Sequence, residues 1–356
     1  MLARAPDEPI PDSLETLLGS ELLDSGLLDR LDVISRKMLT GKLPGERRSK
    51  RRGASVEFDD FRQYTPGDDL RRIDWNIYAR FDRLILKLFR EDEDLGVHIV
   101  LDASPSMHAG SPNKAIHAHR LAAVLSYLAL VSQNRVGLSV LTTGRAGASG
   151  GEGQEPALHT LAPARGRQSL VRFTEFLLTS LRDSAGEPDR LPPASRAAVR
   201  VSHGDPLGSA IRAACSRTTG KGVFVVISDL LEPAWLPGVE PGPSHALNAM
   251  VGGGRFDAHL LQVLSPQELD PASGADLGLT GDVRLTDAET GLAAEVTVTP
   301  DALAAYRKRA KAYQDRLEQA AATRGVRVRL CGTSEPIGPT LVRSLARLGL
   351  LGAPGM

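Results

Sequence analysis

The sequence of 356 residues has little cysteine, few aromatic residues and no excess of charge of either sign. Its two cysteines, Cys215 and Cys331, are too few for a disulfide framework or a thiolate zinc site, and such scarcity is typical of a reducing compartment. Aromatic residues make up only 4%, so we expect a core of Leu, Val and Ala. The 43 basic and 43 acidic residues balance, so net charge gives no reason to expect binding to nucleic acid or membranes.

Long hydrophobic runs are also missing from the sequence. The longest nearly apolar run, residues 121–131, is too short to span a bilayer. Residues 1–14 contain prolines and acids without an apolar centre, so we expect no signal peptide there. These features together predict a soluble, cytoplasmic protein.

The chain divides into parts by the pattern of its residues. We expect a flexible lead over residues 1–25, and then an N-terminal helix, a charged collar and a strand over residues 26–94. Residues 95–264 and 299–352 alternate strands and helices, which predicts an α/β fold with a doubly wound, mostly parallel sheet. Residues 265–298 contain a predicted hairpin, which we expect to pack on the collar as a small β subdomain, because isolated hairpins are marginal in water.

Individual elements follow from the periodicity of apolar residues. Strands are expected at 83–89, 97–101, 136–141, 157–161 (a short edge strand), 223–227, 256–264, 282–285, 295–298 and 326–330. Helices are expected at 14–39 (one or two helices), 114–131, 169–181, 205–216, 299–325 and 337–351.

The segment that organises the chain is residues 97–107, where an apolar strand runs into a polar turn. Alternate side chains in extended backbone point the same way, so Asp102, Ser104 and Ser106 can converge on one point. Three hard oxygen ligands suit a small hard cation such as Mg²⁺, with Mn²⁺ or Ca²⁺ as alternatives. A capped turn, in which these side chains accept hydrogen bonds from the next helix, explains the same residues.

Two further segments reach the same edge of the predicted sheet, because ligands of such sheets lie beyond the carboxyl ends of the strands. Asp205 opens one predicted helix, and Asp229 ends an apolar strand. We expect Asp229 to be a further oxygen ligand of the same cation, while Asp205 is either a fifth oxygen ligand or the cap of its helix. Met107 and Trp235, on two of these loops, are either presented to a partner or buried beneath the loops.

These three segments resemble the metal-ion-dependent adhesion site of von Willebrand factor A domains. That family surrounds one divalent ion with an Asp-x-Ser-x-Ser turn, a Thr from a second loop and an Asp from a third. By this resemblance Asp102, Ser104, Ser106 and Asp229 match the ligands residue for residue. Asp205 stands where the family has a Thr, which argues against a mechanism in which a partner's acid completes the shell of the ion.

A longer resemblance covers nearly the whole chain from about residue 26. Its signature is Arg-Gly-x-Ser-x-Glu-Phe at 52–58, Arg-x-Tyr-x-Pro-Gly-Asp-Asp-x-Arg-x-Ile-Asp-Trp at 62–75, and Leu-Asp-x-Ser-x-Ser-Met at 101–107. This signature resembles the MoxR-associated family called domain of unknown function 58. The resemblance implies a von Willebrand factor A-like domain that works with a MoxR-type AAA ATPase, as an adaptor for a protein client.

Three functions stay open at this point. We favour a non-enzymatic scaffold that binds proteins, with no nucleic acid partner, no membrane span and an undetermined oligomeric state. A metal-dependent hydrolase would need a general base, for which the sequence offers only His108 and His203 near the loops. A nucleic-acid binder would act through the basic run 42–52, which lacks interleaved aromatic residues. No phosphate loop of the G-x-x-x-x-G-K type occurs, so we expect no ATPase activity.

Overall fold

The computed structural model describes residues 9–19, 32–33, 57–65, 70, 73–90, 96–143, 155–185, 198–235, 242–272, 281–289, 292–337 and 351–352. The chain forms two compact units. The larger unit contains Met1–Glu46 and Leu95–Pro354, and the smaller contains Arg47–Asp94.

The larger unit is built on a seven-stranded sheet in the order β12-β9-β8-β4-β5-β6-β7. The strands are β4 (Gly96–Asp102), β5 (Arg135–Thr142), β6 (Ala157–Ala164), β7 (Val199–Arg200), β8 (Gly222–Ser228), β9 (Phe256–Leu264) and β12 (Arg327–Gly332). The five strands from β12 to β5 are parallel to their neighbours, while β6 and β7 are antiparallel. The mostly parallel sheet predicted from the sequence is thereby confirmed.

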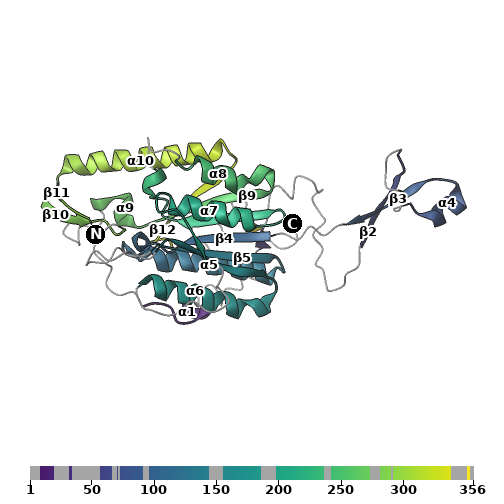
Figure 1. Cartoon of the computed structure of the whole chain (residues 1–356), viewed down its shortest axis with the longest axis horizontal. Helices are drawn as coiled ribbons and strands as arrows, with labels where there is room; N and C mark the ends of the chain where they lie inside the picture. The colour runs from purple at the N-terminus through teal and green to yellow at the C-terminus, as the bar shows by residue number, and fades with distance from the viewer. Residues whose placement is uncertain are drawn as a thin grey trace. The chain divides into compact units, whose positions relative to one another are not determined.

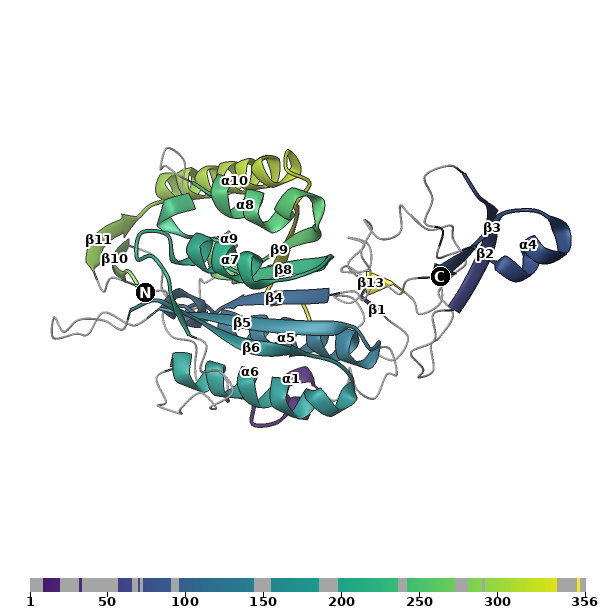
Figure 2. The same ribbon diagram turned by 45° about the vertical axis from the view of Figure 1, so that its right-hand side comes forward.

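Helices cover both faces of this sheet (Figures 1 and 2). One face carries α1 (Leu14–Leu18), α5 (Lys114–Val131) and α6 (Leu170–Ala185), and the other carries α7 (Pro206–Arg217), α8 (Ser244–Val251) and α10 (Pro300–Ala322). Alternate residues of β4 point to opposite faces, so Ile99 packs in the first core cluster and Val100 in the second. A sheet buried on both faces explains why its central strands are nearly continuous apolar runs.

The register of the central strands determines where the site lies. β4 pairs with β8 from Gly96 opposite Gly222 to Leu101 opposite Ile227, without a shift. Both strands therefore end at the same edge, with Asp102 at the end of β4 and Asp229 directly after β8. β9 pairs with β8 in parallel, and the short helix α9 (Pro266–Leu269) follows β9 at this edge.

The hairpin in the larger unit stands apart from the cores. Its strands β10 (Gly281–Thr286) and β11 (Ala293–Val298) pair antiparallel, with Gly281 opposite Val298 and Thr286 opposite Ala293. None of their residues belongs to either core cluster, and most of their side chains are exposed. The hairpin is predicted correctly from the sequence, while its packing against the collar stays a prediction.

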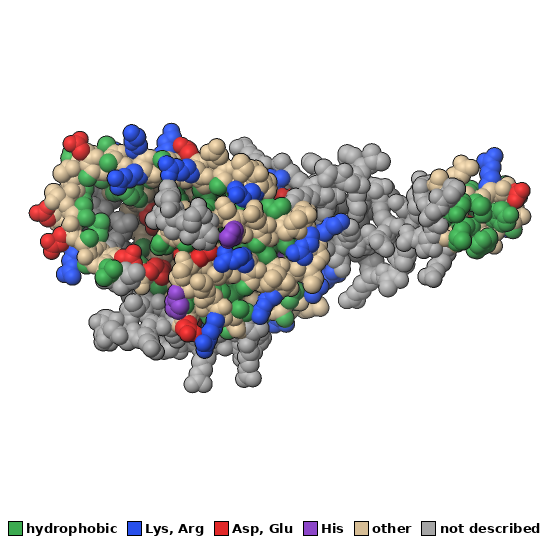
Figure 3. Space-filling model, turned by 45° about the horizontal axis from the view of Figure 1, so that its top comes forward, with side chains coloured by type: hydrophobic (Ala, Val, Ile, Leu, Met, Phe, Trp, Pro, Cys, Tyr) green, Lys and Arg blue, Asp and Glu red, His purple; other side chains and the backbone are tan. Residues whose placement is uncertain are grey.

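The smaller unit is a two-stranded sheet and a helix. β2 (Glu57–Gln63) pairs antiparallel with β3 (Ile85–Arg90), and α4 (Trp75–Phe81) lies between them in sequence. Asp74 caps α4 by accepting hydrogen bonds from the amides of Asn76 and Ile77. The helix leaves Trp75 and Phe81 exposed, and hydrophobic side chains gather on this unit in Figure 3. The sequence reasoning missed α4 because it interpreted the charges of the collar as ion pairs.

Most other elements agree with the prediction, and two differ. The helix at 114–131 and the strand at 256–264 have the predicted bounds. The strand expected at the edge, 157–161, is instead an inner strand, because β7 pairs with its outer side. The one or two helices expected within 14–39 do not extend over Asp32–Val33, because these residues form strand β1, which pairs antiparallel with β13 (Leu351–Gly352). The structure also contains elements that were not predicted, namely the strands β2 and β7 and the short helices α8 and α9.

Several predicted features lie outside the described residues. They are the basic run 42–52, most of the charged positions of the collar and the interior of the closing helix 337–351. Within the described ranges, no helix combines the length and apolar character needed to cross a membrane.

Candidate binding site at the carboxyl edge of the sheet

Asp102 is held by a hydrogen bond to each of its carboxylate oxygens. Oδ1 accepts from the amide of Ser104 at 2.9 Å, and Oδ2 accepts from the hydroxyl of Ser228 at 2.6 Å. The pKa of Asp102 is raised from 3.8 to about 6, mainly by burial and secondly by the nearby charge of Asp229. Ser228, the last residue of β8, was missed in the sequence because it ends an otherwise apolar strand.

The two serines of the turn lie together. Ser104 is buried and Ser106 is half-buried, and their hydroxyl oxygens are 3.0 Å apart. The turn continues as a short 3-10 helix over Pro105–His108. The structure thus brings the three members of the Asp-x-Ser-x-Ser motif into one turn, as the alternation of the motif predicts.

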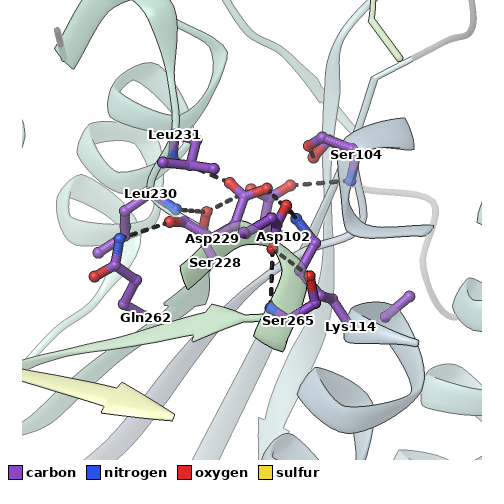
Figure 4. A network of polar contacts seen from close by, with 12 residues as sticks. Asp102, Ser104, Lys114, Ser228, Asp229, Leu230, Leu231, Gln262 and Ser265 are labelled. Carbon is purple, nitrogen blue, oxygen red and sulfur yellow. Dashed lines mark hydrogen bonds and ion pairs between the residues drawn. The ribbon is translucent and has the colours of Figure 1, made fainter. Parts of the chain in front are cut away.

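A buried lysine faces Asp229 from the start of α5. The Lys114 ammonium is fully buried and donates to Asp229 Oδ2 at 2.8 Å (Figure 4). It also donates to Glu268 Oε1 at 2.5 Å. Burial alone lowers the pKa of Lys114, but the charges of Asp229 and Glu268 outweigh it and raise this pKa above its ordinary 10.5. The sequence reasoning did not assign a role to Lys114, since nothing in its neighbourhood distinguishes it from an exposed helix residue.

The second carboxylate oxygen and the backbone carbonyl of Asp229 also accept hydrogen bonds. Its Oδ1 accepts from the amide of Leu231 at 3.1 Å, and its carbonyl accepts from the side-chain amide of Gln262 at 3.0 Å (Figure 4). Glu268 in turn accepts from the amide and hydroxyl of Ser265. The loops after β8 and β9 are therefore tied to the start of α5 by one ammonium group.

Asp205 serves as the cap of α7. Its Oδ1 accepts from the amide of Gly208 at 3.0 Å and from the indole of Trp235 at 3.2 Å, and Oδ2 accepts from Arg212 at 2.9 Å. A Cβ atom on Gly208 would lie 2.1 Å from Oδ2, so glycine at this position lets the carboxylate fold back over the helix start. Of the two roles predicted for Asp205, the contacts show the cap, and the ligand role stays a prediction.

Two glutamates that the sequence reasoning missed complete the acidic surroundings. Glu232 accepts from the amide of Leu207 at 3.3 Å. Burial first, and then repulsion by Asp102, Asp205 and Glu289, raise the pKa of Glu232 from 4.5 to about 8. Acidic side chains are visible around the hollow at the hairpin end of the larger unit in Figure 3.

Glu289 reaches the site from the tip of the β10–β11 hairpin. Its Oε1 accepts from the amide of Ser106 at 3.0 Å, and its Oε2 accepts from the hydroxyl of Thr143 at 3.1 Å. Burial is the main cause of the raised pKa of Glu289, and Asp229 raises it further. No sequence pattern connects this glutamate to the turn, because 183 residues separate it from Ser106.

The donor set of the site consists of hard oxygens. Within the part of the chain that the structure describes, no three His, Cys, Asp or Glu side chains form a group that could hold a metal by themselves. A cation would therefore depend on the hydroxyls of Ser104 and Ser106 as well as on Asp102 and Asp229. Of the two histidines considered as general bases, His203 is exposed and His108 is half-buried.

Met107 and Trp235 lie beneath the loops of the site. Met107 is fully buried, and Trp235 is 4% exposed. Met107 packs in the core cluster that contains α5, and Trp235 packs in the cluster that contains α7 and donates to Asp205. The suggestion that the two side chains are presented to a partner is therefore wrong, since the loops fold over both.

Comparison with protein families gives a match over most of the chain. The family model described as "Protein of unknown function DUF58" matches residues 60–316. Uncharacterized proteins of Mycobacterium bovis and Mycobacterium tuberculosis are 30% identical to the chain over 277 residues, which cover 77% of this chain and 73% of theirs.

Solved structures give a weaker likeness. The pilus adhesin SpaC from Lactobacillus rhamnosus GG, in its open conformation, has a TM-score of 0.37 and 10% identity over 74% of this chain and 31% of the adhesin. Another crystal form of the same adhesin has a TM-score of 0.27 and 11% identity, over 49% of this chain and 25% of the adhesin. The chain thus spans about a third of the length of the first adhesin structure that it matches.

Replacing the buried ammonium tests its part in holding the edge together. We expect Lys114→Met to lower the free energy of unfolding by about 3–5 kcal/mol, because Asp229 and Glu268 would lose the ammonium that they share. Urea denaturation measures the change, with Lys308→Met on the exposed side of α10 as the matched control. Equal effects of the two substitutions would contradict the role given to Lys114.

The raised pKa of Glu232 predicts a dependence of stability on pH. Because its folded pKa of about 8 exceeds the ordinary 4.5, this group makes the fold progressively less stable as pH rises through that interval. The quantity to compare is the free energy of unfolding of Glu232→Gln minus that of the wild type. We expect this difference to be at least about 1 kcal/mol larger above the interval than near its lower end, since one pKa unit corresponds to about 1.4 kcal/mol. Urea denaturation in EDTA at both ends of the interval measures this difference.

The control for this pH dependence is Glu295→Gln, which changes an exposed glutamate of β11. Its effect on the free energy of unfolding should be small at both pH values. If the stability difference between Glu232→Gln and the wild type did not change with pH, Glu232 would not titrate in this interval.

Proposed function

The chain belongs to the DUF58 family of proteins of unknown function, and we propose that it is a non-enzymatic protein-binding module that holds a divalent cation at the carboxyl edge of its sheet. The observation that carries the proposal is the grouping of Asp102, Ser104 and Ser106 in one turn beside Asp229. This edge of a doubly wound sheet is where such folds place their ligands.

The residues present fit a hard cation such as Mg²⁺, Mn²⁺ or Ca²⁺. Asp102, Ser104, Ser106 and Asp229 would hold it, and all four offer oxygen, which these ions prefer. The mutual repulsion of Asp102 and Asp229 supports the same assignment. Asp205 is not required, because its carboxylate oxygens already accept hydrogen bonds from Gly208, Trp235 and Arg212.

The cation would supply positive charge where Lys114 alone does not balance the acids. Lys114 pairs with Asp229 and Glu268, whereas Asp102 accepts only from an amide and a hydroxyl in the contacts described above. Relief of repulsion would order the turn 102–108 and the loop 229–235. An ordered edge of this kind presents a defined surface to a protein partner.

We infer the class of partner from the resemblance of the sequence signature to the MoxR-associated family. A von Willebrand factor A-like domain that acts with a MoxR-type AAA ATPase, and links it to a protein client, accounts for a binding edge without catalytic machinery. The absence of turnover is part of the proposal, because His203 is exposed and the ammonium of Lys114 is buried against two acids, where it cannot act as a base.

Calorimetric titration with Mg²⁺ and Mn²⁺ tests the cation. We expect saturable binding to the wild type and loss of at least tenfold in affinity in Asp102→Asn, which keeps the shape of the side chain and removes its charge. Bound cation should also raise the free energy of unfolding, by about 2.7 kcal/mol at a hundred times the Kd.

The matched control is Asp301→Asn, which changes an exposed aspartate in the first turn of α10. This variant should bind the cation as the wild type does. If the folded wild type bound neither ion at millimolar concentration, Asp102, Ser104 and Ser106 would be turn formers only, and the proposed function would lose its basis.

A further inference from the structure

At the tip of the β10–β11 hairpin, the carboxylate of Glu289 accepts hydrogen bonds from two donors that belong to other elements, the amide of Ser106 and the hydroxyl of Thr143. Ser106 lies in the turn after β4, and Thr143 directly follows β5, so the two donors come from the ends of neighbouring strands. Each donates to a different oxygen of Glu289, at 3.0 and 3.1 Å. Two donors that each take one oxygen fit a carboxylate specifically, because a carboxylate offers two equivalent acceptors.

The surroundings of Glu289 make this contact one that can be exchanged. The glutamate is half-buried, and its two hydrogen-bond donors lie on other elements. Both donors are neutral, so no ion pair with them holds the carboxylate in place. The hairpin strands themselves contribute nothing to either core cluster, so release of the tip leaves the cores intact.

We propose that Ser106 and Thr143 form a recognition site for an acidic side chain of a protein partner, and that Glu289 occupies this site from within the chain until the partner displaces it. The proposal rests on the protein-binding function proposed above and names the chemistry of the partner. It does not require the partner's acid to contact a cation, because the donors are an amide and a hydroxyl.

The hairpin tip also indicates what accompanies the acid. Leu292, three positions after Glu289, is 73% exposed, and Leu231 beside the acidic edge is 41% exposed. A partner segment in which an acidic residue is followed within a turn by an apolar one would offer the same combination. The hairpin tip has this pattern itself, so a peptide of its own sequence is a defined probe.

The probe is a peptide of residues 284–294, compared with the same peptide carrying Gln at the position of Glu289. In the wild type, the tethered Glu289 competes with the peptide at a high effective concentration. We therefore expect Glu289→Ala to bind the glutamate peptide at least tenfold more tightly than the wild type does. The glutamine peptide should bind Glu289→Ala at least tenfold more weakly than the glutamate peptide.

Two further variants assign the effect to the site. Thr143→Val in the Glu289→Ala background removes one donor and should weaken binding of the glutamate peptide at least threefold. Glu295→Ala removes an exposed glutamate from the same hairpin and should leave the affinity at the wild-type value. Circular dichroism and urea denaturation of each variant verify that it is folded.

Fluorescence anisotropy with labelled peptide, in EDTA and in saturating Mg²⁺, separates the possible failures. Suppose that Glu289→Ala binds Mg²⁺ normally, binds the two peptides with equal affinity, and binds the glutamate peptide no more tightly than the wild type does. The carboxylate site is then overturned while the cation proposal stands. If the glutamate peptide binds selectively in EDTA and no cation binds, the carboxylate site stands and the cation proposal fails.

Discussion

The pairing of the Lys114 ammonium with two carboxylates determines the architecture of the functional edge. A fully buried ammonium is tolerated only where opposite charges meet it, so Asp229 and Glu268 must both arrive at the start of α5. These residues lie 115 and 154 positions away in sequence. Glu268 then fixes Ser265 through its second oxygen, so one positive charge sets the positions of the loops after β8 and β9.

The same pairing leaves the neighbouring acids without compensation from Lys114. Asp102 and Glu232 are held mainly by neutral donors. Burial first, and then the charge of Asp229, raises the pKa of Asp102, while burial first, and then the charge of Asp102, raises the pKa of Glu232. A fold that only needed stability would gain from neutral side chains at these positions, because buried unpaired charge is costly. The grouping therefore agrees with the cation site proposed above.

The central sheet could be predicted because its information is local. An apolar run that ends in a polar turn specifies a buried strand, and parallel neighbours bring the carboxyl ends of β4 and β8 to one edge. This reasoning places Asp102 near Asp229 without knowledge of any contact. It gives Asp205 two roles, of which the structure shows the cap. The capping partner Gly208 is local in sequence, whereas the contacts with Trp235 and Arg212 depend on the packing of α7.

The residues that sequence reasoning missed share a different property: each acts through a partner that no local pattern indicates. Lys114 looks like an ordinary first residue of a helix, and Ser228 like the end of an apolar strand. Glu289 looks like a turn residue, until the insertion of the hairpin between β9 and α10 brings its tip to Ser106. Because that tip lies outside the cores, we expect substitutions in it to change the free energy of unfolding little. A substitution of Lys114 should lower it strongly. The edge thus combines a buried ion pair with a hairpin tip outside the cores, which agrees with the displacement of Glu289 proposed above.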